Sequence, residues 1–180
     1  MNNINKKHGI SAFFFSYSSY IGIFSPYLSL WLNFKSFSPA EIGVLMSPMQ
    51  WSRVFGPPFW GWLADSGKDP NFAKKLIAVS ALFASLISVL LFFEWTLVSL
   101  FFVFCIISFF LSGHIPITES LAMQTSRGNM GIYGKMRLWG SIGFIFSVLV
   151  GGLIFDFYGI QYIPMALFIC LILLVFFSFF

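Results

Sequence analysis

Charge is scarce in this sequence. Only 9% of the 180 residues are charged, whereas 58% are hydrophobic and 21% are aromatic. A soluble domain carries about 25% charged residues, and a soluble fold of this length cannot bury so much apolar surface. The composition therefore excludes a soluble globular protein and predicts an integral membrane protein.

Cysteine and the signatures of catalysis are also scarce. Cys105 and Cys170 lie within apolar blocks, where a thiol packs as a small hydrophobic group. No His, Cys or carboxylate cluster has metal-ligand spacing, and no Gly-Lys-Ser/Thr phosphate loop is present. No nucleophile lies in a recognisable catalytic motif. We therefore expect no enzyme, no cofactor, no metal and no ATP-driven engine.

Long apolar runs fill most of the chain. Six of them approach or exceed the roughly 20 residues that a helix needs to cross a bilayer. The run "LFFVFCIISFFLS" does not alternate as a barrel strand would, so helices are favoured. We predict an all-α integral membrane fold, a single six-helix bundle over residues 1–180. The spans are 10–32, 42–64, 76–93, 96–121 (interrupted by Pro116), 138–157 and 162–180.

The loop charges predict an orientation. Eight basic residues lie at the N-terminus and after the second and fourth spans: Lys6, Lys7, Lys68, Lys74, Lys75, Arg127, Lys135 and Arg137. The opposite loops contain only Lys35. Since cytoplasmic loops carry the excess of Lys and Arg, we expect a multi-pass protein of the cell (inner) membrane with a cytoplasmic N-terminus. The small, separate basic groups do not indicate a nucleic-acid partner.

The sequence ends at "VFFSFF" without a basic residue after the sixth span. A helix that exits into the cytoplasm usually carries such an anchor. This ending predicts that the polypeptide is one half of something longer. A naturally short six-helix protein is the alternative.

Short echoes indicate an internal repeat. "GIFSP" (residues 22–26) returns as "SGHIP" (112–116), and "GWLAD" (61–65) returns as "GLIFD" (152–156), both about 90 residues later. Because three spans separate the copies, the two halves enter the membrane from opposite sides. This pattern predicts the inverted 3+3 repeat of a secondary-transporter half.

Arg53 is predicted to lie deep in the bilayer. It lies 12 residues before Asp65, or roughly 18 Å along a helix. Arginine near the bilayer centre costs about 2.5–3.5 kcal/mol on insertion scales. No acid lies within one helical turn, so its partner is expected on another helix or in an anionic ligand. A structural partner such as a helix carbonyl is the alternative.

Glu119 and Arg137 are expected at a similar depth, because the fourth and fifth spans form an antiparallel hairpin. A carboxylate in a low-dielectric cleft needs a cation or a proton. Arg137 can serve either Glu119 or a substrate carboxylate. The alternative is an interfacial arginine that reaches water beside a solvated acid.

The first and fifth spans have contrasting faces. Ser16, Tyr20 and Tyr27 lie close to one face of the first span, bordered by Tyr17, which favours a cavity. Small residues at spacings of three and four give the fifth span a stripe where another helix can approach closely: Gly140, Gly143, Ser147 and Gly151.

Several segments resemble the major facilitator superfamily. "GWLADSGKDPNFAKK" (residues 61–75) resembles its signature between helices 2 and 3, although Ser66 stands where the family usually has a base. The matching positions are Gly61, Asp65, Gly67 and Lys68. "YGKMRLWGSIGF" (133–144) is similar to the start of helix 5 in the lactose-permease-like branch. "SYIGIFSPYLSLWL" (19–32) and "SRVFG" (52–56) resemble the phenylpropionate permease subfamily.

The resemblance covers essentially the whole chain and implies the N-terminal half of a twelve-helix fold. The spacing of Glu119 and Arg137 is that of the substrate-binding pair of lactose permease, which implies a substrate site. The signature implies that Gly61, Asp65, Gly67 and Lys68 act in gating, with Asp65 as a latch through ion pairs. An ordinary exposed acid is the alternative for Asp65.

The expected function is proton-coupled import of a small organic anion such as 3-phenylpropionate. Arg53 and Arg137 would meet its carboxylate, and Tyr17, Tyr20 and Phe144 would face its organic part. Coupling residues of the related permeases lie largely in the second half, so a missing six-helix half is an expected partner beside protons and lipid. A sugar or nucleoside symporter of the same fold is one alternative. A non-transporting fragment or assembly partner is the other.

Overall fold

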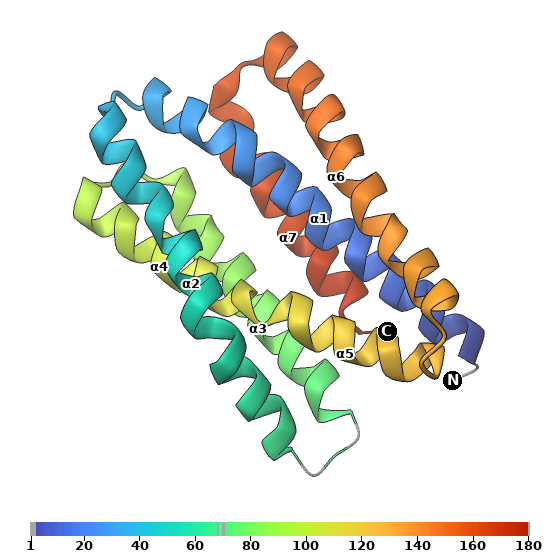
Figure 1. Ribbon diagram of the computed structural model, residues 1–180. Coiled ribbons are helices and arrows are strands. Elements are labelled where there is room, and N and C mark those ends of the chain that lie inside the picture. The colour runs from blue at the N-terminus through green and yellow to red at the C-terminus, as the bar shows by residue number, and fades with distance from the viewer. Residues whose placement is uncertain (1–2, 68, 70, 180) are drawn as a thin grey trace.

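The computed structural model describes residues 3–67, 69 and 71–179, and this part of the chain consists of helices and short connections (Figure 1). The prediction of an all-α fold is confirmed for these residues. The α-helices, with short 3-10 helices marked η, are α1 (Asn3–Phe34), α2 (Pro39–Ser66), α3 (Phe72–Ser88), η1 (Val89–Phe92), α4 (Leu97–Ser112), α5 (His114–Ser126), α6 (Met130–Tyr158), η2 (Ile160–Tyr162) and α7 (Ile163–Phe177).

Four described segments are long and apolar enough to cross a membrane: 72–92, 97–126, 130–158 and 160–177. They correspond to the last four predicted spans. The helices α1 and α2 are also long, at 32 and 28 residues, but their mean hydropathy is lower than that of these four segments. Serine and tyrosine interrupt the apolar run of α1, and proline and charged residues interrupt that of α2.

The fourth predicted span consists of two consecutive helices. α4 ends at Ser112, Gly113 forms the junction, and α5 begins at His114. Pro116 lacks an N–H group and leaves the carbonyl of Ser112 without its usual helical donor. The expected interruption by Pro116 therefore occurs, and the break itself lies three residues earlier.

Side-chain caps define the helix starts in the connections. Ser38 and Glu41 form a reciprocal capping box at the start of α2, which satisfies two backbone N–H groups. Thr96 caps α4 through Ser99 N. The side-chain carbonyl oxygen of Asn129 accepts hydrogen bonds from the N–H groups of Gly131 and Ile132 at the start of α6. These caps fix where the helices begin, which the apolar composition of the chain alone does not specify.

The helices run back and forth along the bundle (Figure 1). α1 packs against α6 and α7, α2 packs against α4, and α3 packs against α4 and α7. The start of α1, the α2–α3 connection and the α5–α6 turn lie toward one end of the bundle, and the α1–α2, α3–α4 and α6–α7 connections lie toward the other. The helix ends that carry most of the described lysine and arginine residues therefore share one end of the bundle.

The contact between α1 and α6 is made by small residues on α6: Gly140, Gly143, Ser147 and Gly151, all buried. A Cβ atom on Gly143 would overlap the backbone of Phe15. Ser19 donates a hydrogen bond to the Gly143 carbonyl at 3.2 Å, and Tyr27 donates one to the Val148 carbonyl at 2.6 Å. The missing side chains thus allow backbones to approach closely enough for interhelical hydrogen bonds.

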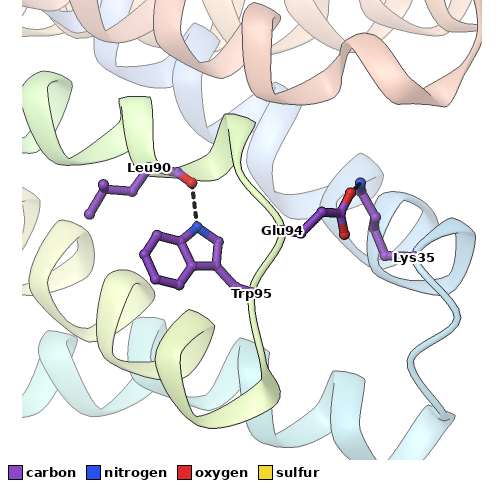
Figure 2. Close-up of polar contacts among 4 residues, drawn as sticks. All are labelled: Lys35, Leu90, Glu94 and Trp95. Atoms are coloured by element: carbon purple, nitrogen blue, oxygen red, sulfur yellow. Dashed lines mark hydrogen bonds and ion pairs between the residues drawn. The ribbon is translucent and has the colours of Figure 1, made fainter.

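Polar contacts join two connections at the end opposite the basic loops (Figure 2). Lys35 Nζ, after α1, lies 2.6 Å from Glu94 Oε1, between η1 and α4. The neighbouring Trp95 indole donates to the Leu90 carbonyl at 2.5 Å. The Glu94 side chain is 87% exposed, and such exposed pairs contribute only about 0–1 kcal/mol. This ion pair therefore orders the connection more than it stabilises the fold.

Candidate functional site: two adjoining cavities

Two cavities adjoin between α1, α2, α4, α5 and α6. One has a volume of about 400 Å³ and includes Arg137 of α6, and the other has about 370 Å³ and includes Arg53 of α2. We call them the Arg137 cavity and the Arg53 cavity. They share three lining residues, Ser18, Ile115 and Phe144. Arginines far apart in sequence therefore line two neighbouring cavities that share a wall.

Arg137 is already paired. Its Nη1 forms an ion pair with Glu119 Oε1 of α5 and donates a hydrogen bond to Tyr133 Oη at 3.2 Å. The Arg137 side chain is 54% exposed and that of Glu119 is 33% exposed. The structure thus brings together the two residues predicted to lie at similar depth. Glu119 does not line either cavity, but its carboxylate neutralises the guanidinium that does.

Arg53 has different surroundings. It lies in the middle of α2 and lines the Arg53 cavity and a smaller one of about 30 Å³ behind it. No ion pair among the described residues involves Arg53. The local sequence already contained no acid within a turn, and among the described residues the packing brings none within 4.0 Å from another helix.

Aromatic side chains border Arg53. Tyr17 lines the Arg53 cavity, and its ring stacks on the buried imidazole of His114 at 6.0 Å between centroids. Phe144 lies where the two cavities meet. Tyr20 is buried against Phe24 and reaches only the smaller cavity. Of the three predicted aromatic residues, Tyr17 and Phe144 therefore line the Arg53 cavity, and Tyr20 lines the smaller cavity behind it.

The sequence interpretation missed hydroxyl and apolar residues that complete the walls: Ser18, Ser112, Ile115 and Pro57. Ser18 directly follows Tyr17, so a helix-face analysis of α1 that allowed for both residues would have found it. Ser112 begins the repeated "SGHIP" segment, and this repeat is a signal that could have identified it.

The predicted gating residues lie around a third cavity of about 310 Å³. Gly61 and Asp65 of α2 line it together with Ser120 and Gln124 of α5. A Cβ atom on Gly67 would overlap the Phe72 ring, so glycine permits the tight α2–α3 connection. Lys68 lies outside the described residues.

Asp69 forms the ion pair of the α2–α3 connection. Asp69 Oδ2 lies 2.6 Å from Lys75 Nζ, and Asp69 Oδ1 accepts a hydrogen bond from the Asn71 N–H at 2.9 Å. The Lys75 contact, followed by the Asn71 hydrogen bond, lowers the pKa of the Asp69 carboxyl. Asp65 takes part in no ion pair among the described residues. Those residues also contain no group of three or more potential metal ligands.

A protein-family model described as "MFS_1 like family" matches residues 8–180. The chain belongs to this family, within the major facilitator superfamily. The match covers nearly the whole sequence, and relatives named as a probable transporter and as a permease agree with it, so the resemblance noted from the sequence motifs is confirmed. Membership makes this a membrane protein related to transporters.

Three characterised or catalogued relatives support the assignment. The chain is 32% identical over 152 residues to the probable 3-phenylpropionic acid transporter of Escherichia coli (strain K12), covering 83% of the chain and 38% of the relative. It is 30% identical to the maltose permease of Geobacillus stearothermophilus, covering 80% and 36%, respectively. It is 28% identical to an uncharacterized transporter of Bacillus subtilis (strain 168), covering 73% and 32%.

The chain therefore spans less than two fifths of the length of these relatives. No solved structure matches it. The cavities of this major facilitator chain are consequently interpreted from their own residues, without a bound ligand in a related structure as a guide.

Proposed function

We propose that this chain is the N-terminal half of a secondary active transporter that imports a small organic anion together with protons. One observation carries the proposal: Arg53 and Arg137 line two adjoining cavities whose other walls are mainly aromatic, aliphatic and hydroxyl groups. Guanidinium groups recognise carboxylates, and apolar walls with few polar groups are typical of small-molecule sites. The relative named as a 3-phenylpropionic acid transporter supports an aromatic acid as the substrate.

The proposed binding residues have different roles. Arg53 and the Glu119–Arg137 pair supply the charged groups, and Tyr17 and Phe144 contact the organic part of the substrate. Tyr20 supports this wall from behind, where it packs beside Phe24. The carboxylate of Glu119 neutralises the positive charge of Arg137 through their ion pair.

We further propose six membrane spans arranged as an inverted 3+3 repeat. Two close helix contacts support this arrangement: Gly22 against Ser147, between α1 and α6, and Gly56 against Ser112, between α2 and α4. A shift of about 90 residues, the spacing of the sequence echoes, relates Gly22 to Ser112 and Gly56 to Ser147. The same contact therefore recurs with glycine and serine exchanged, as an inverted repeat requires.

The two serines also share their local bonding. Ser112 Oγ donates to the Phe109 carbonyl at 2.7 Å, and Ser147 Oγ donates to the Phe144 carbonyl at 3.0 Å, each three residues earlier in its helix. Both glycines lack the side chain that would meet the partner serine. Because many helical serines of this chain make the same bond, the matching positions of the glycines and serines are what supports the repeat.

For the orientation we propose a cytoplasmic N-terminus in the cell membrane, with the α2–α3 and α5–α6 connections on the same side. The common end of the described basic connections supports it. Gly61, Asp65, Gly67 and Lys68 would then form the cytoplasmic gate. The cavity between Asp65 and α5 gives this gate space to close.

Uptake of labelled 3-phenylpropionate into cells expressing the chain tests the proposal. We expect saturable uptake that an uncoupler abolishes, because the proton gradient would supply the energy. The parallel sample is the chain joined to the second half of the Escherichia coli relative, since alternating access needs two halves rocking about a midplane site. Absence of uptake in both samples, despite confirmed membrane insertion, contradicts transport of this acid.

A sugar symporter of the same fold is the second candidate, favoured by the relative named as a maltose permease. Labelled maltose in the same assay separates the two, because a maltose transporter would take up the sugar and ignore the acid. If neither compound enters but the chain copurifies with another membrane protein, the chain would be an assembly partner rather than a transporter.

A further inference from the structure

We infer that the site selects a singly charged carboxylate, held at Arg53, because Glu119 keeps Arg137 neutralised. This inference rests on the proposed function and narrows its substrate class from organic anions to monocarboxylates. It makes Arg53 the residue that recognises charge. It makes Glu119 a specificity-determining residue, although Glu119 does not line either cavity.

The charge of the two cavities carries the first step. Within the described residues, Arg53 and Arg137 are the only side chains with a full charge that line them. Glu119 reaches Arg137 from outside the lining. Two cations and one anion leave one positive charge, which one carboxylate balances. A second carboxylate on the ligand would have no free cation to balance it and would be repelled by the carboxylate of Glu119.

The partners of each arginine carry the second step. Arg137 is held by Glu119 and by Tyr133 Oη. A substrate carboxylate at Arg137 would be repelled by the negative charge of Glu119. It would also have to compete with Glu119 for the guanidinium group. Arg53 has no carboxylate partner among the described residues. An incoming anion is therefore attracted to Arg53 without displacing another one.

The walls place the rest of the ligand. From Arg53 the space continues toward Ile115 and Phe144, past Tyr17. Besides Arg53, the residues with polar side chains in this lining are Tyr17, Ser18 and Ser112, and three hydroxyls are few for the many hydroxyls of a sugar. Because buried unpaired polar groups are costly, an apolar body with one acidic end fits best.

The inference predicts a gain of function. In Glu119→Gln, Arg137 keeps its charge but loses its counter-ion, so the site carries a second positive charge available to a ligand. A diacid that the native chain rejects should then bind. Loss of a structural residue alone would not create a new specificity.

Binding to the purified chain in lipid nanodiscs tests this with three ligands that share a phenyl group: 3-phenylpropionate, its primary amide and the diacid phenylsuccinate. We expect the native chain to bind 3-phenylpropionate at least about tenfold more tightly than either other ligand. Arg53→Gln should abolish the preference for acid over amide, and Arg53→Lys should keep part of it. Glu119→Gln should raise the affinity for phenylsuccinate relative to 3-phenylpropionate at least about tenfold.

The control is Arg127→Gln, which removes the same charge from an exposed position in the α5–α6 turn and should leave all three affinities unchanged. Amide binding by Arg53→Gln reports that this variant is folded. A retained acid preference in Arg53→Gln, or an unchanged diacid ratio in Glu119→Gln, overturns the inference and leaves the proposed function standing. If the native chain binds no phenyl compound, the proposed substrate fails, and the inference fails with it.

Discussion

Arg53 and Arg137 carry the same charge in different surroundings, and this difference decides what each can do. Arg137 meets Glu119 across the α5–α6 hairpin. Arg53 faces a cavity from the middle of α2 without a described carboxylate partner. An unpaired cation within a membrane protein is costly, so it is retained where a ligand or a function compensates for it. Residue type alone would have given the two arginines equal roles.

One prediction at the residue scale concerns Asp69. Its pKa is lowered from 3.8, first by Lys75 and then by the Asn71 N–H. A group with a lowered pKa in the folded state stabilises it above the unfolded value, and this contribution is lost as the pH falls through the folded value. We therefore expect Asp69→Asn to lower the midpoint of thermal unfolding near neutral pH, and the difference from the native chain to vanish well below pH 3.8.

Asp156→Asn is the matched control, since Asp156 is exposed near the end of α6 and takes part in no described ion pair. It should leave the midpoint unchanged at neutral pH. An Asp69→Asn effect that persists at low pH would mean that the carboxylate charge is not its source.

At the scale of elements, α1 and α6 pack closely because α6 has small residues along their contact. Gly143 permits the backbone of α6 to reach that of Phe15, and Ser19 and Tyr27 then find carbonyl acceptors on α6. Lipid offers no hydrophobic drive for helix association, so close packing and hydrogen bonds supply it. This contact also sets the position of Tyr17 relative to Phe144.

Alanine at two glycines of α6 tests the contact. Gly143→Ala should destabilise the chain by about 1–3 kcal/mol, because the new methyl group meets backbone that cannot move away independently. At Gly134 a Cβ meets nothing within 4 Å, so Gly134→Ala should be neutral or stabilise by about 0.5–1 kcal/mol through helix propensity. Thermal unfolding in detergent measures both. Equal effects of the two substitutions would contradict a close contact at Gly143.

At the scale of the whole molecule, the basic connections gather at one end of the bundle (Figure 1). The Lys35–Glu94 pair lies at the other (Figure 2). This asymmetry is the physical basis of the proposed orientation, because Lys and Arg are retained on the cytoplasmic side. The cavities lie between the two ends, as a site reached alternately from each side requires.

Cysteine labelling of intact cells tests the orientation. In a chain whose Cys105 and Cys170 are replaced by alanine, Ala40→Cys and Met130→Cys place single thiols at exposed helix starts on opposite ends. A membrane-impermeant maleimide should label Ala40→Cys in intact cells and Met130→Cys only after permeabilisation. The reverse pattern would invert the proposed orientation and with it the side of the gate.

Local information predicted much of the fold. Apolar run length identified the last four spans, whose helices the structure contains, and Pro116 marked the broken one. Arg53, Glu119, Arg137, Tyr17 and Phe144 were all named from depth, spacing or resemblance. What the spacing missed were wall residues such as Ser18 and Ile115, because ordinary serines and isoleucines carry no signal until packing places them.

Composition by itself determined that this protein belongs in a membrane, since apolar surface of this extent has no other stable environment. The long, non-alternating apolar runs determined that it is helical. The motifs by themselves determined its family, since they depend only on residue order. Tertiary structure alone decided that Arg137 is neutralised by Glu119 while Arg53 has no described carboxylate partner, and that the two arginines line adjoining cavities. The reason is that ion pairing and cavity shape depend on helix rotation and depth within the bundle, and hydropathy along the chain encodes neither.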